Sequence, residues 1–186
     1  MSDDLIAALG SGPAYRFADW PNPEVPNWRA GVYTVWDGDL LVYVGTAGRG
    51  LHAGSYQSEK ALASARARGF RDRLSSHAAG RRSGDQLCVY VFDRLVLPML
   101  SQTEIVAAAN GQLSLDALTR QYIHDHLSYR LVVTEDGKAA LSLDLRDIGP
   151  TAGAPASQQL QVSSPSGTRS PTVRCRTSSP SPEVIK

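Results

Sequence analysis

The chain has 186 residues, of which 42% are hydrophobic, and its 19 basic and 18 acidic side chains leave a formal net charge of +1. This length suits one domain with a real core, and the near-zero charge excludes a global basic field that would attract polyanions. The two cysteines have no CxxC neighbour and no metal-ligand spacing, which excludes a disulfide framework and a zinc site.

The N-terminal residues 1–27 are predicted to form an arm that packs on the domain. A short helix is expected around Asp4–Leu9, and three prolines within residues 21–26 then force extended or turn backbone. Trp20 or Trp28 would anchor the arm. The acidic start lacks the basic and apolar regions of a signal peptide, and no apolar run is long enough to span a bilayer. We therefore expect a cytoplasmic protein with no membrane partner.

Two apolar runs, Gly31–Trp36 and Leu40–Gly45, flank Asp37-Gly38-Asp39. Runs of β-branched and aromatic residues around Asp-Gly predict a β-hairpin. This hairpin would place the phenols of Tyr33 and Tyr43 on adjacent strands.

The length of the hairpin loop decides whether these two phenols can meet. A two-residue turn at Asp37-Gly38 would put Tyr33 and Tyr43 on opposite faces, because side chains alternate along a strand. A three-residue loop over residues 36–38 would put both rings on one face as diagonal neighbours, roughly 7–8 Å apart. We predict the three-residue loop or another register of the same parity.

A helical stretch is predicted from Ser58 to His77, with an interruption at Gly69 and with Gly80 just past its end. Arg73 and His77 are four residues apart and would share one stripe of this helix. Basic residues cluster within this helical stretch and just after it. Such a patch suffices for contacts with phosphate groups. The alternative interpretation is an ordinary solvated helix face. The cluster comprises Arg66, Arg68, Arg71, Arg73, Arg81 and Arg82.

The later elements follow from composition and periodicity. A third strand is expected over Gln86–Phe92, reaching towards Leu97, and a helix over Ser114–Leu127 with Ser114 as its cap. An extended segment at Tyr129–Thr134 and a short helix at Lys138–Asp147 complete the domain. Residues 149–186 are rich in proline, serine and threonine, and they are predicted to be disordered.

The tripeptides Gly31-Val32-Tyr33 and Tyr43-Val44-Gly45, followed by Arg73 and His77 on a helix and then a strand, resemble the GIY-YIG nuclease family. The resemblance covers residues 28–148. It implies an α+β fold with a three-stranded antiparallel sheet flanked by helices. It also implies a metal-dependent endonuclease that cuts phosphodiester bonds of nucleic acid, which we expect to be DNA.

Carried over by motif, the resemblance makes Tyr33 the general base and gives Tyr43 the task of orienting water or phosphate. Arg73 would grip the non-bridging oxygens, and His77 would hydrogen-bond a tyrosine or the phosphate. A free phenol, with a pKa near ~10, is a poor base at neutral pH. Positive charge from Arg73 and a metal would have to favour the phenolate.

Further phosphate contacts are expected from Gly45, Arg71 and Arg81. The family holds one divalent metal, Mg²⁺ or Mn²⁺, with a glutamate on a late helix. This sequence offers Asp144 at the matching place, with Glu135 as a rival carboxylate in a turn.

Two other functions stay open. Aspartate at 144 instead of glutamate suggests a module that binds nucleic acid without cutting it. A structural or partner-binding domain is the third reading, with Trp20, Trp28 and Leu95–Leu100 as its contact surface. No separate recognition domain is apparent, so either a protein partner supplies the specificity of cutting or that specificity is low.

Overall fold

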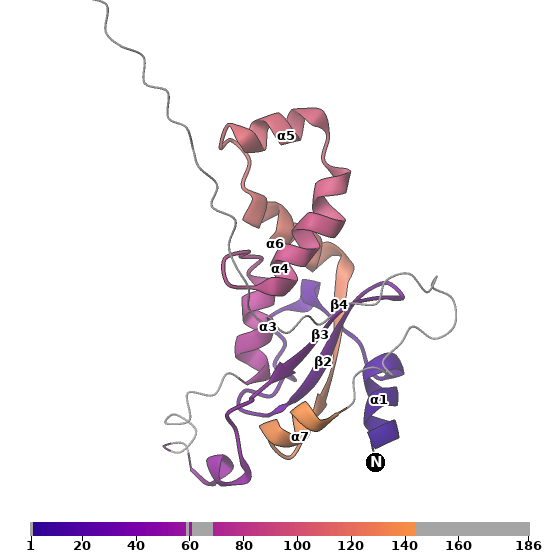
Figure 1. Ribbon diagram of the computed structural model, residues 1–186, viewed down its shortest axis with the longest axis vertical. Helices are drawn as coiled ribbons and strands as arrows, with labels where there is room; N and C mark the ends of the chain where they lie inside the picture. Colours follow the sequence, from indigo (N-terminus) through magenta and orange to yellow (C-terminus); the bar gives the residue numbers. More distant parts are fainter. Residues whose placement is uncertain (1, 59, 61–68, 144–186) are drawn as a thin grey trace, which may run out of the picture. The chain divides into compact units, whose positions relative to one another are not determined.

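The computed structural model describes residues 2–58, 60 and 69–143 (Figure 1). The predicted tail at 149–186, the first half of the predicted arginine-rich helix and the proposed metal ligand Asp144 lie outside the described residues.

In the described ranges, four strands form one antiparallel sheet in the order β1-β4-β2-β3. The α+β class is thereby confirmed, but the expected three-stranded sheet is not. The N-terminal arm adds β1 and the extended segment before Thr134 forms β4, whereas the expected strand at Gln86–Phe92 is absent from the sheet. The strands are β1 (Tyr15–Arg16), β2 (Gly31–Asp37), β3 (Leu40–Ala47) and β4 (Leu127–Val133).

The hairpin β2–β3 turns through two residues, Gly38 and Asp39, because Asp37 pairs with Leu40. Gly38 has a φ of +55°, which a glycine adopts without steric cost. The predicted three-residue loop is therefore wrong.

A β-bulge restores the predicted parity. Trp36 pairs with Leu41 but Val35 pairs with Tyr43, so Val42 is the extra residue on β3. Without it, the two-residue turn would place Tyr43 opposite Thr34 and on the other face of the sheet from Tyr33. With it, Tyr33 and Tyr43 share a face, and this part of the prediction is confirmed.

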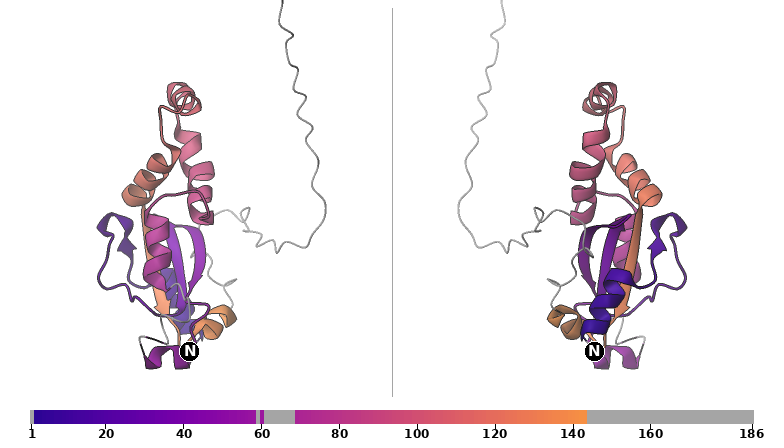
Figure 2. Two further views of the ribbon diagram at one scale, coloured as in Figure 1. Left: turned by 90° about the vertical axis from the view of Figure 1, so that its left-hand side faces the viewer. Right: turned by 90° about the vertical axis from the view of Figure 1, so that its right-hand side faces the viewer.

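The two faces of the sheet bury separate apolar clusters. The face that carries Tyr33 packs against Phe70 and Leu74 of α3 and Ile123 of α6. The opposite face buries Val32 and Val132 against α1 and α7. Figure 2 shows α1 and α3 on opposite sides of the sheet. These helices are α1 (Ser2–Ser11), α3 (Phe70–Ala78), α6 (Leu115–His126) and α7 (Gly137–Ser142).

The predicted third strand is a helix. Residues Gln86–Val91 form α4, which continues through a π-helical turn η3 (Phe92–Val96) and a 3-10 turn η4 (Leu97–Met99). The carboxylate of Asp85 caps α4 by accepting the backbone N–H of Cys88 at 3.2 Å. Helical spacing then buries Leu87, Cys88 and Val91 together, which alternating strand faces could not do.

The predicted helices near Asp4–Leu9, at Gly69–His77 and at Ser114–Leu127 are found in the described residues. The predicted helix Lys138–Asp147 is shorter than expected, because α7 ends at Ser142 and Leu143 has extended backbone, with φ −64° and ψ 123°. Gly69 precedes α3, Gly80 follows it with a φ of +67°, and the Ser114 hydroxyl caps α6 by accepting the N–H of Ala117. A further helix, α5 (Gln102–Ala109), was not predicted. It lies beyond α4 and α6, at the end farthest from the sheet (Figures 1 and 2).

The N-terminal arm contributes to the core, as expected. Leu9 and Phe17 are fully buried, and Phe17 belongs to the turn η1 (Phe17–Asp19). Of the two proposed anchors, Trp20 packs edge-on against Tyr129 with ring centroids 6.2 Å apart, whereas Trp28 remains 43% exposed.

Candidate functional site

Three rings from three elements meet on one face of the sheet. The ring centroids of Tyr33 on β2 and Tyr43 on β3 are 6.2 Å apart, and each lies 5.6 Å from the imidazole of His77 on α3. Arg73 lies one helical turn before His77 on α3. The structure thus brings together four residues that the sequence singled out.

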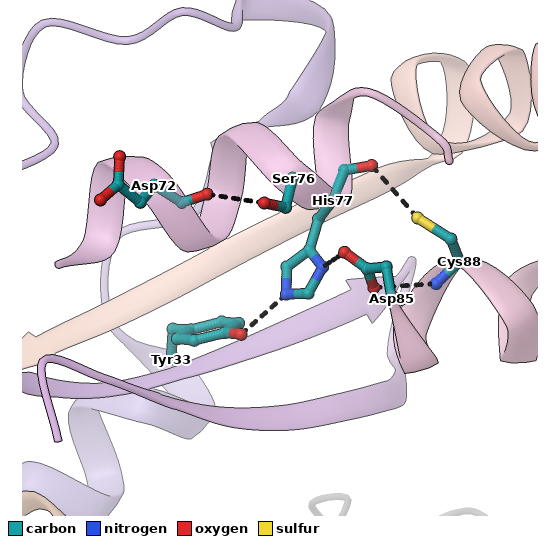
Figure 3. Close-up of polar contacts among 6 residues, drawn as sticks. All are labelled: Tyr33, Asp72, Ser76, His77, Asp85 and Cys88. Carbon is teal, nitrogen blue, oxygen red and sulfur yellow. Dashed lines mark hydrogen bonds and ion pairs between the residues drawn. The ribbon is translucent and has the colours of Figure 1, made fainter. Parts of the chain in front are cut away.

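His77 connects a phenol to a carboxylate. Its Nε2 lies 2.7 Å from the Tyr33 hydroxyl and its Nδ1 lies 2.7 Å from Oδ2 of Asp85 (Figure 3). Tyr33 is 1% exposed and His77 is 3% exposed, so water hardly competes for these hydrogen bonds. Tyr33, His77 and Asp85 form one chain of hydrogen bonds, which we call the Tyr33–His77–Asp85 chain.

The charge of Asp85 follows from its hydrogen bonds. Burial alone would raise the pKa of the Asp85 carboxyl. The hydrogen bond from His77, the positive charge that this imidazole carries whenever it is protonated, and the backbone N–H of Cys88 together hold this pKa below its ordinary value. The carboxylate is therefore ionised at neutral pH and can only accept hydrogen bonds.

The phenol at the other end of the chain behaves in the opposite way. Burial raises the pKa of Tyr33 far above its ordinary value, and the nearby Tyr43 and Asp85 add to the rise. Arg73 and Arg49 lower this pKa, as expected for Arg73, but burial outweighs them. Tyr33 is therefore a neutral phenol at neutral pH, and it needs a proton acceptor before it can act as a base.

Tyr43 forms the more accessible part of the cluster. Burial raises its pKa, and so does the charge of Asp85, whereas Arg73 and Arg49 lower it. Arg49 is a cation that the sequence reading did not single out. It follows β3, is exposed, and donates from Nε to the Thr46 hydroxyl at 2.8 Å.

Gly45 has a packing role that was not foreseen. It pairs with Tyr33 across the hairpin, and a Cβ at this position would lie 2.3 Å from Cζ of the Tyr33 ring. The glycine is required because the phenol occupies the space that any side chain would need.

The other expected phosphate contacts lie away from the three rings. Arg71 points to the N-terminal arm, where its Nη2 donates to the backbone oxygen of Asn22 at 3.4 Å. Arg81 is exposed in the loop before α4, where its charge acts on Asp116. Arg82, its neighbour, donates to the same carboxylate at 3.0 Å.

Metal ligands are not defined by the part of the chain that the structure describes. Within it, no group of three histidine, cysteine, aspartate or glutamate side chains lies close enough to hold an ion. Glu135 is exposed in its turn, as expected, and Asp85 already engages His77 and Cys88. Asp144 lies outside the described residues.

Asp85 is the residue of this hydrogen-bond chain that was not predicted from the sequence. It lies eight residues after His77 in a loop, so no helical or strand spacing relates the two. One local signal was present: an aspartate directly before the apolar run Gln86–Val91 is typical of a helix N-cap. Reading that signal would also have predicted α4 as a helix.

Comparison of the chain with protein-family models, with curated proteins and with solved structures found no match. Among the described residues, no helix combines the length and the apolar character needed to cross a membrane.

Proposed function

We propose that this chain is a nuclease that hydrolyses phosphodiester bonds of DNA at the cluster of Tyr33, Tyr43, Arg73 and His77. The observation that carries the proposal is the 2.7 Å hydrogen bond between the Tyr33 hydroxyl and His77 Nε2. It gives a buried phenol a proton acceptor, and general base catalysis by a phenol needs one. The resemblance to the GIY-YIG family supports the same assignment.

The proposed step moves two protons in sequence. Tyr33 takes a proton from the attacking water as its own hydroxyl proton passes to His77 Nε2. The hydroxide oxygen bonds to phosphorus, the bond from phosphorus to the leaving oxygen breaks, and the leaving alkoxide takes a proton from water. His77 then returns its extra proton to solvent. In this proposal the water enters from the side of Tyr43, the more exposed of the two phenols.

Arg73 would hold the phosphate during this step. It is half-buried on α3, and its charge acts on both phenols. A planar guanidinium binds two non-bridging oxygens at once and stabilises the charge that develops on them. A divalent cation at Asp144, Mg²⁺ or Mn²⁺, would add charge stabilisation at the phosphate.

Nicking of supercoiled plasmid in Mg²⁺ or Mn²⁺ tests the role of Tyr33. We expect Tyr33→Phe to nick about 10²–10⁴-fold more slowly, because proton transfer from water is lost. Tyr122→Phe is the matched control, since it also loses one phenol hydrogen bond of 2.7 Å, to Asp37, but lies outside the cluster. Equal nicking by wild type and Tyr33→Phe would contradict the proposal, as would a wild type that does not nick.

The same assay separates phosphate binding from general effects of charge. We expect Arg73→Ala to slow nicking and to weaken salt-sensitive binding of DNA, whereas Arg120→Ala, an exposed arginine on α6, removes the same charge without effect. Salt-sensitive binding by a wild type that does not nick would instead favour the module that binds nucleic acid without cutting.

Exposed apolar side chains favour partner binding as a second candidate function. Four of them lie on the consecutive elements η4 and α5, and a contiguous exposed apolar patch is typical of a protein contact. The exposed fractions are 66% for Met99, 48% for Val106, 43% for Leu97 and 41% for Ile105. A wild type that neither nicks nor binds DNA would favour this function.

A further inference from the structure

The carboxylate of Asp85 uses its two oxygens for two different purposes. Oδ2 faces Nδ1 of His77 at 2.7 Å, and Oδ1 accepts the backbone N–H of Cys88 at 3.2 Å (Figure 3). The Asp85 side chain is 8% exposed and the His77 side chain 4% exposed. The bond to Cys88 is the N-cap of α4, so the start of this helix fixes the rotation of the carboxylate.

This arrangement decides which imidazole nitrogen carries the proton. A carboxylate only accepts, so the neutral imidazole of His77 must donate from Nδ1. Its Nε2 then presents a lone pair to the Tyr33 hydroxyl, which donates to it across 2.7 Å. The opposite tautomer would set a lone pair of Nδ1 against a negatively charged oxygen of Asp85.

We propose that Asp85 is the positioning residue that makes His77 the acceptor of the Tyr33 proton. The inference rests on the proposed nuclease function and adds a residue to it. In the step, the O–H bond of Tyr33 breaks and an N–H bond forms at His77 Nε2. The imidazolium that results lies against the carboxylate, which balances its charge, and the phenolate receives the proton of the attacking water.

The helix cap makes Asp85→Asn an unusually clean variant. The amide oxygen must still face the N–H of Cys88, because the reversed amide would set an NH₂ group against that N–H. The NH₂ group therefore faces Nδ1 of His77 and forces the proton onto Nε2. Nε2 then donates to the Tyr33 oxygen and cannot accept its proton.

Long-range ¹H–¹⁵N correlation spectra of the histidine rings test the inference without any substrate. The chain has four histidines, and His77→Gln identifies the signals of His77 by their loss. We expect the wild-type ring to be protonated on Nδ1 and the ring of Asp85→Asn on Nε2. A wild-type proton on Nε2, or an unchanged tautomer in Asp85→Asn, would overturn the inference.

Plasmid nicking supplies the second measurement. We expect Asp85→Asn to nick about 10²–10⁴-fold more slowly than wild type. Asp85→Ser is the control for the fold, since a serine caps α4 but leaves Nδ1 without its carboxylate, and we expect an intermediate rate. Unchanged α-helix content in circular dichroism would show that α4 persists in both variants.

The two proposals fail in distinguishable ways. If wild type and Asp85→Asn nick equally, the inference is overturned while the nuclease function stands. If the wild type does not nick but its tautomer follows residue 85, the control of His77 by Asp85 is supported and the nuclease proposal is overturned.

Discussion

At the scale of single residues, one imidazole lies between a phenol and a carboxylate with opposite proton affinities. Burial keeps the Tyr33 phenol protonated by raising its pKa, whereas hydrogen bonds keep Asp85 ionised by lowering its pKa against the effect of burial. The hydroxyl proton of Tyr33 is thus held on the phenol, and Nε2 of His77 is the atom that lies within reach to accept it.

The lowered pKa of Asp85 predicts how stability depends on pH. A carboxyl whose pKa is lower in the folded state stabilises the fold above its unfolded value of 3.8, and this contribution is lost as the pH falls through the folded value. His77 and the Cys88 N–H contact this carboxylate, and its charge also acts on the phenols of Tyr33 and Tyr43. We therefore expect the melting temperature of wild type to fall towards that of Asp85→Asn below about pH 4. A difference between them that stays constant down to about pH 2.5 would contradict the linkage.

At the scale of elements, the hairpin brings a side chain and a backbone into close contact. The Tyr33 ring covers Gly45, and a methyl group there would lie 2.4 Å from the phenol oxygen. We expect Gly45→Ala to lower the free energy of unfolding by about 1–3 kcal/mol and to displace Tyr33 from His77. Gly54→Ala is the control, because nothing lies within 4 Å of its added Cβ. Denaturant unfolding measures both variants, and equal stability of the two would contradict this packing.

Local sequence signals predicted the hairpin and α6. They failed for the bulge and for α4, whose conformations depend on tertiary packing. Asp-Gly between apolar runs marks a hairpin, but the bulge at Val42 depends on how β3 fits the core and not on the turn. The run Gln86–Val91 suits a strand by composition, and tertiary packing with the Asp85 cap makes it a helix. The proximity of Tyr33, Tyr43 and His77 could be predicted from the resemblance of the two tripeptides to a known motif. The hydrogen bond between His77 and Asp85 could not, because no regular sequence spacing relates these two residues.

At the scale of the whole molecule, the N-terminal arm completes the domain. It adds β1 to the sheet and covers both faces, through Phe17 on one side and Leu9 on the other. A boundary at residue 28, as the family resemblance implies, would cut through this core.

Truncating a side chain before residue 28 and truncating Trp28 should lower the free energy of unfolding by different amounts. We expect Phe17→Ala to lower the free energy of unfolding by about 3–5 kcal/mol, because Phe17 is fully buried. Trp28→Ala removes a larger side chain that is 43% exposed, and we expect a smaller cost because a smaller share of its apolar surface is buried. Chemical denaturation compares them, and a cost of less than about 1 kcal/mol for Phe17→Ala would contradict the assignment of the arm to the core.

The bulge at Val42 has a second consequence, for contacts between molecules. Within the described residues, β3 is an outer strand of the sheet, and an open strand offers its free N–H and C=O groups to another chain. Such edges are where sheets of separate molecules join and aggregate. The extra residue breaks the even spacing of these groups on β3. The same residue that turns Tyr43 towards Tyr33 therefore also makes this edge a poor template for fibrils.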